Sequence, residues 1–167
     1  AADQLLAKDP ADPYFLELKG QVLLESGRPH EALDPLRRAT AMTNAEPLIA
    51  SLFGHALIAT EDDGNFEEAE RVLRAAVGRD RRNPFAWYQL GVVYAARGDT
   101  ARARLASAEQ QVMNRQYGLA LRSAQAAEYG LEHGTPDWIR AQDIGMQARA
   151  LLERQCEMER GRDCAPG

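Results

Sequence analysis

The chain has 167 residues, 45% of them hydrophobic and 27% charged, which is the composition of an ordinary globular protein and excludes a disordered chain. Its formal net charge is −5 and its isoelectric point about 5.3, so we expect neither a nucleic acid nor an anionic membrane as its partner. No apolar run reaches the roughly 18–20 residues that a membrane span requires.

The first residues have the character of the end of a helix. Residues 1–8 carry neither the basic start nor the apolar centre of a signal peptide. Residues 9–13, with the sequence Asp-Pro-Ala-Asp-Pro, have the composition of a turn. We therefore expect a helix remnant here, in a fragment that was cut within or just after an upstream helix.

Proline and glycine divide the rest of the chain into about eight predicted helices. Proline is favoured at the first position of a helix, and glycine just beyond its end. Gly27 and Gly98 are therefore expected to end two helices, and the acidic segment 60–65 is expected to be a loop. The predicted helices begin at Pro13, Pro29, Pro47, Phe66, Pro84, Thr100, Tyr117 and Pro136, and the last one extends to about Met158.

The segment 83–99 has the most specific pattern in the chain. Trp87, Leu90 and Tyr94 follow the spacing W-x₂-L-G-x₂-Y, which places them on one face of a helix. Gly91 lies on the same face, where the missing side chain would let a paired helix approach closely. Trp87 and Trp138 are predicted to be core residues. The pattern resembles the first helix of a tetratricopeptide repeat.

The same pattern recurs along the chain. Gly20, Gly54 and Gly91 are separated by 34 and 37 residues. The corresponding alanines of the second helices show the two spacings in the opposite order, which places a three-residue insertion in the loop 60–65. These alanines are Ala32, Ala69 and Ala103.

We therefore predict an all-α fold, a tetratricopeptide-type right-handed superhelix of antiparallel helix pairs. It forms a single domain over residues 1–160, with repeats at about 13–46, 47–83, 84–116 and 117–158. The helix from Thr100 can serve both as the second helix of one repeat and as the first of the next, because each helix of a solenoid contacts only its neighbours. Residues 161–167 are expected to be disordered.

Residues that could support catalysis are sparse. The three histidines are isolated from one another, and the chain has no H-E-x-x-H, P-loop, G-x-S-x-G or dinucleotide motif. We expect no catalytic, cofactor or metal site in this chain. Cys156 and Cys164 match no common zinc or redox spacing, and both a local disulfide and two free thiols are open.

Two rows of residues on the predicted first helices are candidates for partner binding. In tetratricopeptide stacks, the residue after the conserved glycine and the one a turn earlier tend to face the concave groove. Here the set is Glu17, Gln21, Ser51, His55, Tyr88 and Val92. This mixed polar and aromatic set suits an extended or helical segment of a protein partner. Ordinary surface residues are the alternative.

Four segments carry a narrower resemblance, namely residues 12–21, 25–28, 105–109 and 134–144. They resemble the C-terminal repeat region of bacterial zinc metalloproteases of the CAAX-prenyl-endopeptidase-like family, in particular its BepA-like members. The resemblance implies export to the periplasm and an upstream protease domain, which would hold the zinc and is absent from this chain. It also implies that the repeats position substrates or outer-membrane assembly proteins.

The expected function is therefore a protein-interaction module. In one interpretation it is the substrate- or partner-positioning part of a periplasmic zinc metalloprotease in envelope protein quality control. In the other it is a free-standing scaffold, without a protease, for envelope, pilus or secretion assembly.

Overall fold

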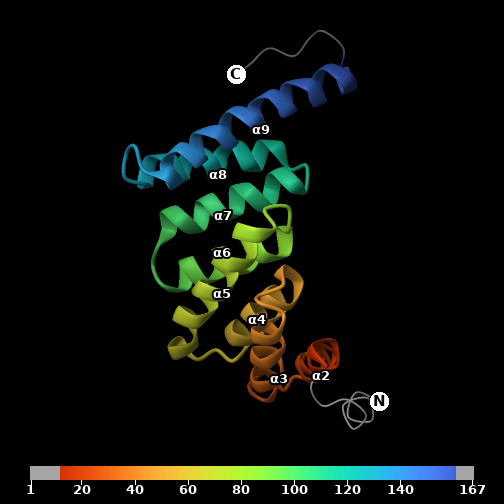
Figure 1. Cartoon of the computed structure of the whole chain (residues 1–167). Coiled ribbons are helices and arrows are strands. Elements are labelled where there is room, and N and C mark those ends of the chain that lie inside the picture. The colour runs from red at the N-terminus through yellow and green to blue at the C-terminus, as the bar shows by residue number, and fades with distance from the viewer. Residues whose placement is uncertain (1–11, 161–167) are drawn as a thin grey trace. The chain divides into compact units, whose positions relative to one another are not determined.

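The computed structural model describes residues 12–160, so the predicted helix remnant at 1–8 and the predicted disordered tail at 161–167 lie outside the described residues. Residues 12–160 form eight α-helices, one 3₁₀ turn (η1, Asp63–Asn65) and no strand (Figure 1). The helices are α2 (Pro13–Glu25), α3 (Pro29–Met42), α4 (Pro47–Ala59), α5 (Phe66–Arg79), α6 (Pro84–Ala96), α7 (Thr100–Met113), α8 (Tyr117–Gly130) and α9 (Pro136–Arg160). The all-α prediction and the eight predicted helix starts are confirmed.

The chain divides into two compact units, Ala1–Val93 and Tyr94–Gly167, with the boundary inside α6. We call them unit 1 and unit 2 and describe each by itself.

Side-chain caps fix several of the helix starts. Asp12 accepts hydrogen bonds from the backbone N–H groups of the first turn of α2 at 2.8 and 3.2 Å, and Glu46 does the same for α4 at 3.0 and 3.1 Å. Asn83 caps α6 and Asp99 caps α7. In the first three of these helices a proline follows the cap, where its missing N–H costs nothing. These starts are therefore set by local sequence.

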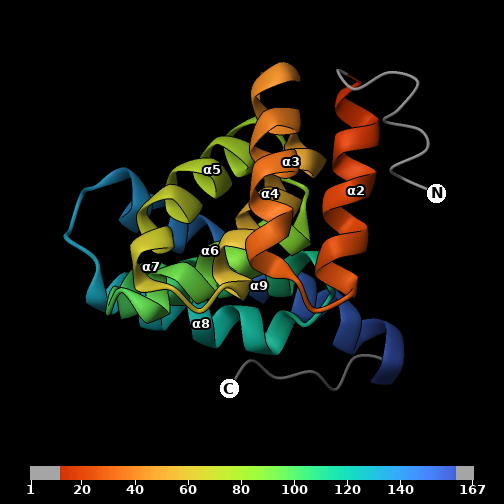
Figure 2. The ribbon, with the colours of Figure 1, turned by 90° about the horizontal axis from the view of Figure 1, so that it is seen from below.

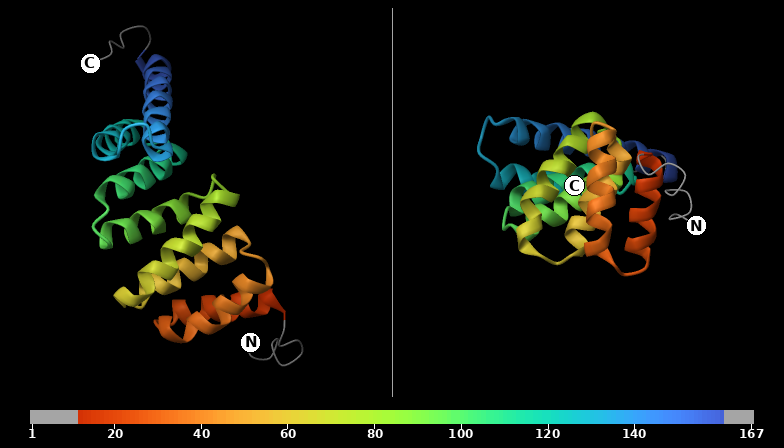
Figure 3. Two further views of the ribbon diagram at one scale, coloured as in Figure 1. Left: turned by 60° about the vertical axis from the view of Figure 1, so that its left-hand side comes forward. Right: turned by 60° about the horizontal axis from the view of Figure 1, so that its bottom comes forward.

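In unit 1 the helices form antiparallel pairs, with α2 beside α3 (Figure 2) and α4 beside α5 (Figure 3, left). The recurring glycine sets the distance within each pair. A Cβ atom on Gly20 would lie 2.3 Å from Cγ of Leu36, and one on Gly54 would lie 2.5 Å from Cγ of Leu73. Both leucines are fully buried. For Gly91 the close approach stays a prediction.

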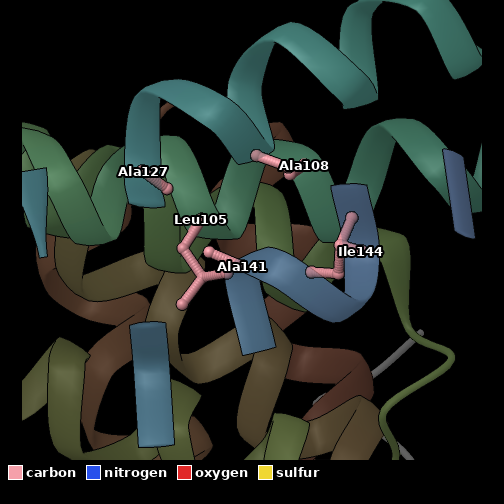
Figure 4. Packing of buried hydrophobic residues seen from close by; sticks show 6 residues of the cluster. Leu105, Ala108, Ala127, Ala141 and Ile144 are labelled. Carbon is pink, nitrogen blue, oxygen red and sulfur yellow. The ribbon is translucent and has the colours of Figure 1, made fainter. Parts of the chain in front are cut away.

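In unit 2, helices α7, α8 and α9 pack largely through alanine side chains. Figure 4 shows the labelled side chains of this core lying between the three helices. An ion pair adds to the packing, because Arg140 of α9 donates two hydrogen bonds to the buried carboxylate of Glu109 of α7, at 2.6 and 2.8 Å. Helix α9 has 25 residues against 14 in α8, and it extends past the end of α8 (Figure 1). The core residues are Leu105, Ala108, Ala124, Ala127, Ala141 and Ile144.

The two tryptophans are a correction to the sequence prediction, since both are half-buried and neither is in the core. The indole Nε1–H of Trp87 donates to the carbonyl oxygen of Arg81 at 3.0 Å. The ring of Trp138 lies against His133, with centroids 4.0 Å apart. An indole is large and carries a donor that needs a partner, so it is rarely buried completely.

Candidate functional site

The first helices of unit 1 present equivalent residues on one side. In α2, α4 and α6 alike, three positions spaced i, i+3 and i+7 share a helical face. We call these nine positions the first-helix face. They are Tyr14, Glu17 and Gln21 on α2, Leu48, Ser51 and His55 on α4, and Phe85, Tyr88 and Val92 on α6.

The most exposed row of this face was not among the sequence predictions. Tyr14, Leu48 and Phe85, each directly after the proline that begins its helix, are 62%, 64% and 43% exposed. Tyr88 adds a second exposed aromatic side chain on α6, at 56%. The signal was present in the sequence as Pro-Tyr, Pro-Leu and Pro-Phe pairs at spacings of 34 and 37 residues. The predicted binding residues came only from the two rows nearer the glycine, so this third row was not predicted.

Ser51 does not line an open surface. Ser51 is buried, with 1% exposure. Its hydroxyl donates to the carbonyl oxygen of Pro47 at 2.5 Å and accepts from Nδ2 of Asn83 at 3.2 Å. Asn83 also caps α6. The two side chains thus connect α4 to the start of α6, and Ser51 contributes to packing.

His55 is half-buried and held in a fixed orientation. Its Nδ1 lies 2.9 Å from Nε2 of Gln89, and its ring meets the ring of Phe85 edge-on at a centroid distance of 5.6 Å. These two contacts join α4 to α6. Val92, one helix turn beyond Tyr88, is half-buried.

The α2 part of the face is acidic. Glu17 is half-buried, and burial, followed by the negative charge of Glu46, raises the pKa of its carboxyl group. Glu46 itself caps α4, and within residues 12–160 no ion pair involves Glu17. Gln21 is exposed and donates to Glu25 at 2.9 Å.

Helices α4 and α6 contain no Asp, Glu, Lys or Arg, whereas α3 and α5 carry both acidic and basic residues. On these two outer helices Arg37 pairs with Glu68 at 2.8 Å and Arg74 pairs with Glu70 at 3.6 Å. Helices α3 and α5 therefore expose ion pairs to solvent. Over α4 and α6 the first-helix face has no fixed charge, and over α2 it carries one carboxylate, that of Glu17.

A cleft of about 240 Å³ lies between α8 and α9 in unit 2, where Gln142 donates to Glu128 at 2.8 Å. No nucleophile with an adjacent base lines it. The lining residues are Leu121, Gln125, Glu128, Gln142, Gly145, Met146 and Arg149.

No three His, Cys, Asp or Glu side chains of the described residues gather closely enough to hold a metal ion. No helix between residues 12 and 160 is both long and apolar enough to cross a membrane. Cys156, on α9, is disulfide-bonded, and the other cysteine of the sequence, Cys164, lies outside the described residues.

Comparisons with known proteins agree with the fold. Two crystal structures of MamA resemble the chain, one with a TM-score of 0.64 and 19% identity over 94% of this chain and 88% of that one. The other has a TM-score of 0.63 and 16% identity over 99% of this chain and 85% of that one. No curated protein sequence matches the chain.

A sequence model of the tetratricopeptide repeat matches residues 1–47 and 59–118, which is well over half of the chain. With the helix pairs and the recurring glycine contacts, this match shows that the chain belongs to the tetratricopeptide-repeat family.

Proposed function

We propose that this chain is a protein-binding module that holds a segment of a partner protein on the first-helix face of unit 1. Tetratricopeptide repeats are protein-interaction modules, and the proposal assigns the contact to a particular surface. The observation that carries it is the exposed row of Tyr14, Leu48 and Phe85, which occupies the same position in three successive first helices. Large apolar side chains gathered on one surface are typical of sites that bind proteins.

The double substitution Leu48→Asp with Phe85→Asp tests this assignment. Random 12-residue peptides displayed on phage are selected on the wild-type protein, and the affinity of selected peptides is then measured by fluorescence anisotropy. We expect the double variant to bind at least about tenfold more weakly, because each aspartate would be desolvated against an apolar ligand. Its melting temperature should stay close to that of the wild type, since both side chains are exposed.

Met42→Asp is the matched control. Met42 is an exposed apolar residue at the end of α3, 50% exposed and outside the first-helix face. We expect this variant to bind as the wild type does. Equal loss in the control and the double variant, or unchanged binding in both, would overturn the assignment.

We further propose that the module works in an oxidising compartment, the periplasm. The disulfide of Cys156 supports this location, because structural disulfides persist in oxidising compartments and are rare in the cytosol. Mass spectrometry of the protein purified from its natural host, without reductant, tests it. A mass two hydrogens below that of the reduced chain is expected, and two free thiols would contradict the proposal.

Two settings fit a periplasmic binding module. The resemblance to BepA-like metalloproteases supports a parent enzyme in which an upstream domain binds zinc and cleaves envelope proteins, while these repeats position substrates or outer-membrane assembly proteins. A free-standing scaffold for envelope, pilus or secretion assembly fits the fold equally well.

The gene sequence upstream of the codon for Ala1 decides between the two settings. An export signal and an H-E-x-x-H helix would support the protease setting, and zinc-dependent cleavage by the full-length protein would be the next assay. A reading frame that begins within a few helices of Ala1 would exclude the protease setting and support the free-standing scaffold.

A further inference from the structure

We infer that the partner segment is apolar and uncharged where it crosses α4 and α6, and that it carries a lysine or arginine over Glu17 of α2. This inference rests on the proposed function and adds the chemistry of the partner. It follows from the unequal distribution of charge along the first-helix face.

The α4 and α6 part of the face has no fixed charge that could compensate a charge on the ligand. Neither helix contains Asp, Glu, Lys or Arg, and the one histidine, His55, is half-buried with its Nδ1 2.9 Å from Nε2 of Gln89. The exposed large side chains there are Leu48, Phe85 and Tyr88. A charged ligand side chain placed against them would lose hydration without gaining an ion pair. Aliphatic and aromatic side chains would instead bury apolar area and pack against the two rings.

The α2 part of the face has the opposite character. Glu17 is half-buried near the carboxylate of Glu46, and no ion pair within residues 12–160 offsets its charge. Lys19 lies two positions further along α2, and residues at i and i+2 do not share a helical face. A cation from the partner would relieve the repulsion between the two carboxylates and form a charge-assisted hydrogen bond.

The helix spacing sets the distance between the two features in the partner. Packed helices lie about 8–10 Å apart, so the row from Tyr14 across Leu48 to Phe85 spans roughly 16–20 Å. An extended chain rises about 3.3 Å per residue and crosses this distance in about five to six residues. The expected partner motif is therefore a basic residue with large apolar residues over the next five to six positions, in either chain direction.

Parallel peptide selections test this motif. The same phage library of random 12-residue peptides is selected on the wild type, on Glu17→Gln and on Glu67→Gln. Glu67 is the control, because its exposed carboxylate lies on α5, outside the first-helix face. We expect peptides from the wild type and the control to share apolar residues and one lysine or arginine, and peptides from Glu17→Gln to lose the basic residue.

A matched pair of synthetic peptides makes the test quantitative. One is a peptide selected on the wild type, and the other has norleucine in place of its basic residue, with both ends blocked. The wild type should prefer the basic peptide at least about fivefold, and Glu17→Gln should prefer neither. An equal preference in the wild type and Glu17→Gln, or selected peptides without a basic residue, would overturn the inference while leaving the proposed function standing.

Failure of the proposed function would look different. In that case the peptides selected on the wild type would bind the Leu48→Asp, Phe85→Asp variant with unchanged affinity, so they would lie elsewhere on the protein. The inference about Glu17 would then fall together with the assigned surface.

Discussion

The lack of a Cβ atom at the recurring glycines Gly20 and Gly54 sets the spacing of the helix pairs in unit 1. At Gly20 and Gly54 the space for a Cβ is already filled by a buried leucine of the partner helix, at 2.3 and 2.5 Å. The sequence predicted such a close approach for Gly91, which lies at the equivalent place in the next repeat. It could do so because the glycine recurs at a fixed place beside the apolar stripe of each first helix.

The substitution Gly54→Ala should therefore lower the free energy of unfolding by about 1–3 kcal/mol, the usual effect of overpacking a filled core. Gly78→Ala in α5 is the control, because a Cβ there would meet nothing within 4 Å. An alanine in that helix should stabilise the chain by about 0.5–1 kcal/mol. Denaturant titration measures both values, and a neutral Gly54→Ala would refute the close contact.

Glu17 gives a pH-dependent prediction at the same scale. Its pKa is raised in the folded state, so the folded chain binds a proton more tightly than the unfolded chain, and stability falls as the pH rises above 4.5. Glu17→Gln removes that unfavourable charge. The variant should be more stable than the wild type at pH 7, by less than about 1 kcal/mol because Glu17 is only partly buried and solvent screens its charge.

Below pH 4 the wild-type carboxyl is protonated, and the difference in melting temperature between the two proteins should disappear. A variant less stable than the wild type at pH 7 would show that the carboxylate has a structural role. Greater stability combined with weaker binding of the basic peptide is the result expected of a binding residue.

At the scale of helices, the starts and ends were predictable because they depend on neighbouring residues. Capping side chains, initial prolines and the positive-φ glycines Gly27 and Gly98 act within one or two turns, and the sequence displays them directly. The ion pairs between helices were not predictable. They join residues 31 to 35 positions apart, and their geometry depends on how the helices pack.

The pair of Arg140 with Glu109 should contribute most among these ion pairs. Arg140→Ala would leave the carboxylate of Glu109, whose side chain is only 7% exposed, without its hydrogen bonds. We expect a loss of about 2–3 kcal/mol, below the range for fully buried pairs because Arg140 itself is partly exposed. The accessible pair of Arg102 with Asp137 provides the comparison, and Arg102→Ala should cost less than about 1 kcal/mol.

Thermal or denaturant unfolding followed by circular dichroism measures both variants. Equal losses from Arg140→Ala and Arg102→Ala would mean that the burial of Glu109 does not matter. Within unit 2 this would leave the small-residue contacts of α7, α8 and α9 as the main source of stability.

For the whole chain, the repeat period was enough to predict the fold, and only part of the proposed binding face followed from it. The period placed Glu17, His55 and Tyr88 on first helices, which is where they are found. The period could not show that Ser51 would be buried in a hydrogen bond with Asn83, or that Leu48 and Phe85 would remain exposed. Those properties depend on the neighbouring helix and cannot be deduced from a residue's position in the repeat.

Site-specific photo-crosslinking in the natural host tests the central claim most directly. Benzoylphenylalanine would be placed at positions 14, 48, 85 and 88 of the first-helix face and, for comparison, at the exposed positions 38, 71 and 74 of the outer helices. We predict that the first-helix positions crosslink to a common protein and that the outer positions do not. Crosslinks to that protein from the outer helices alone, or equally from both sides, would contradict the assignment of the first-helix face as the binding surface.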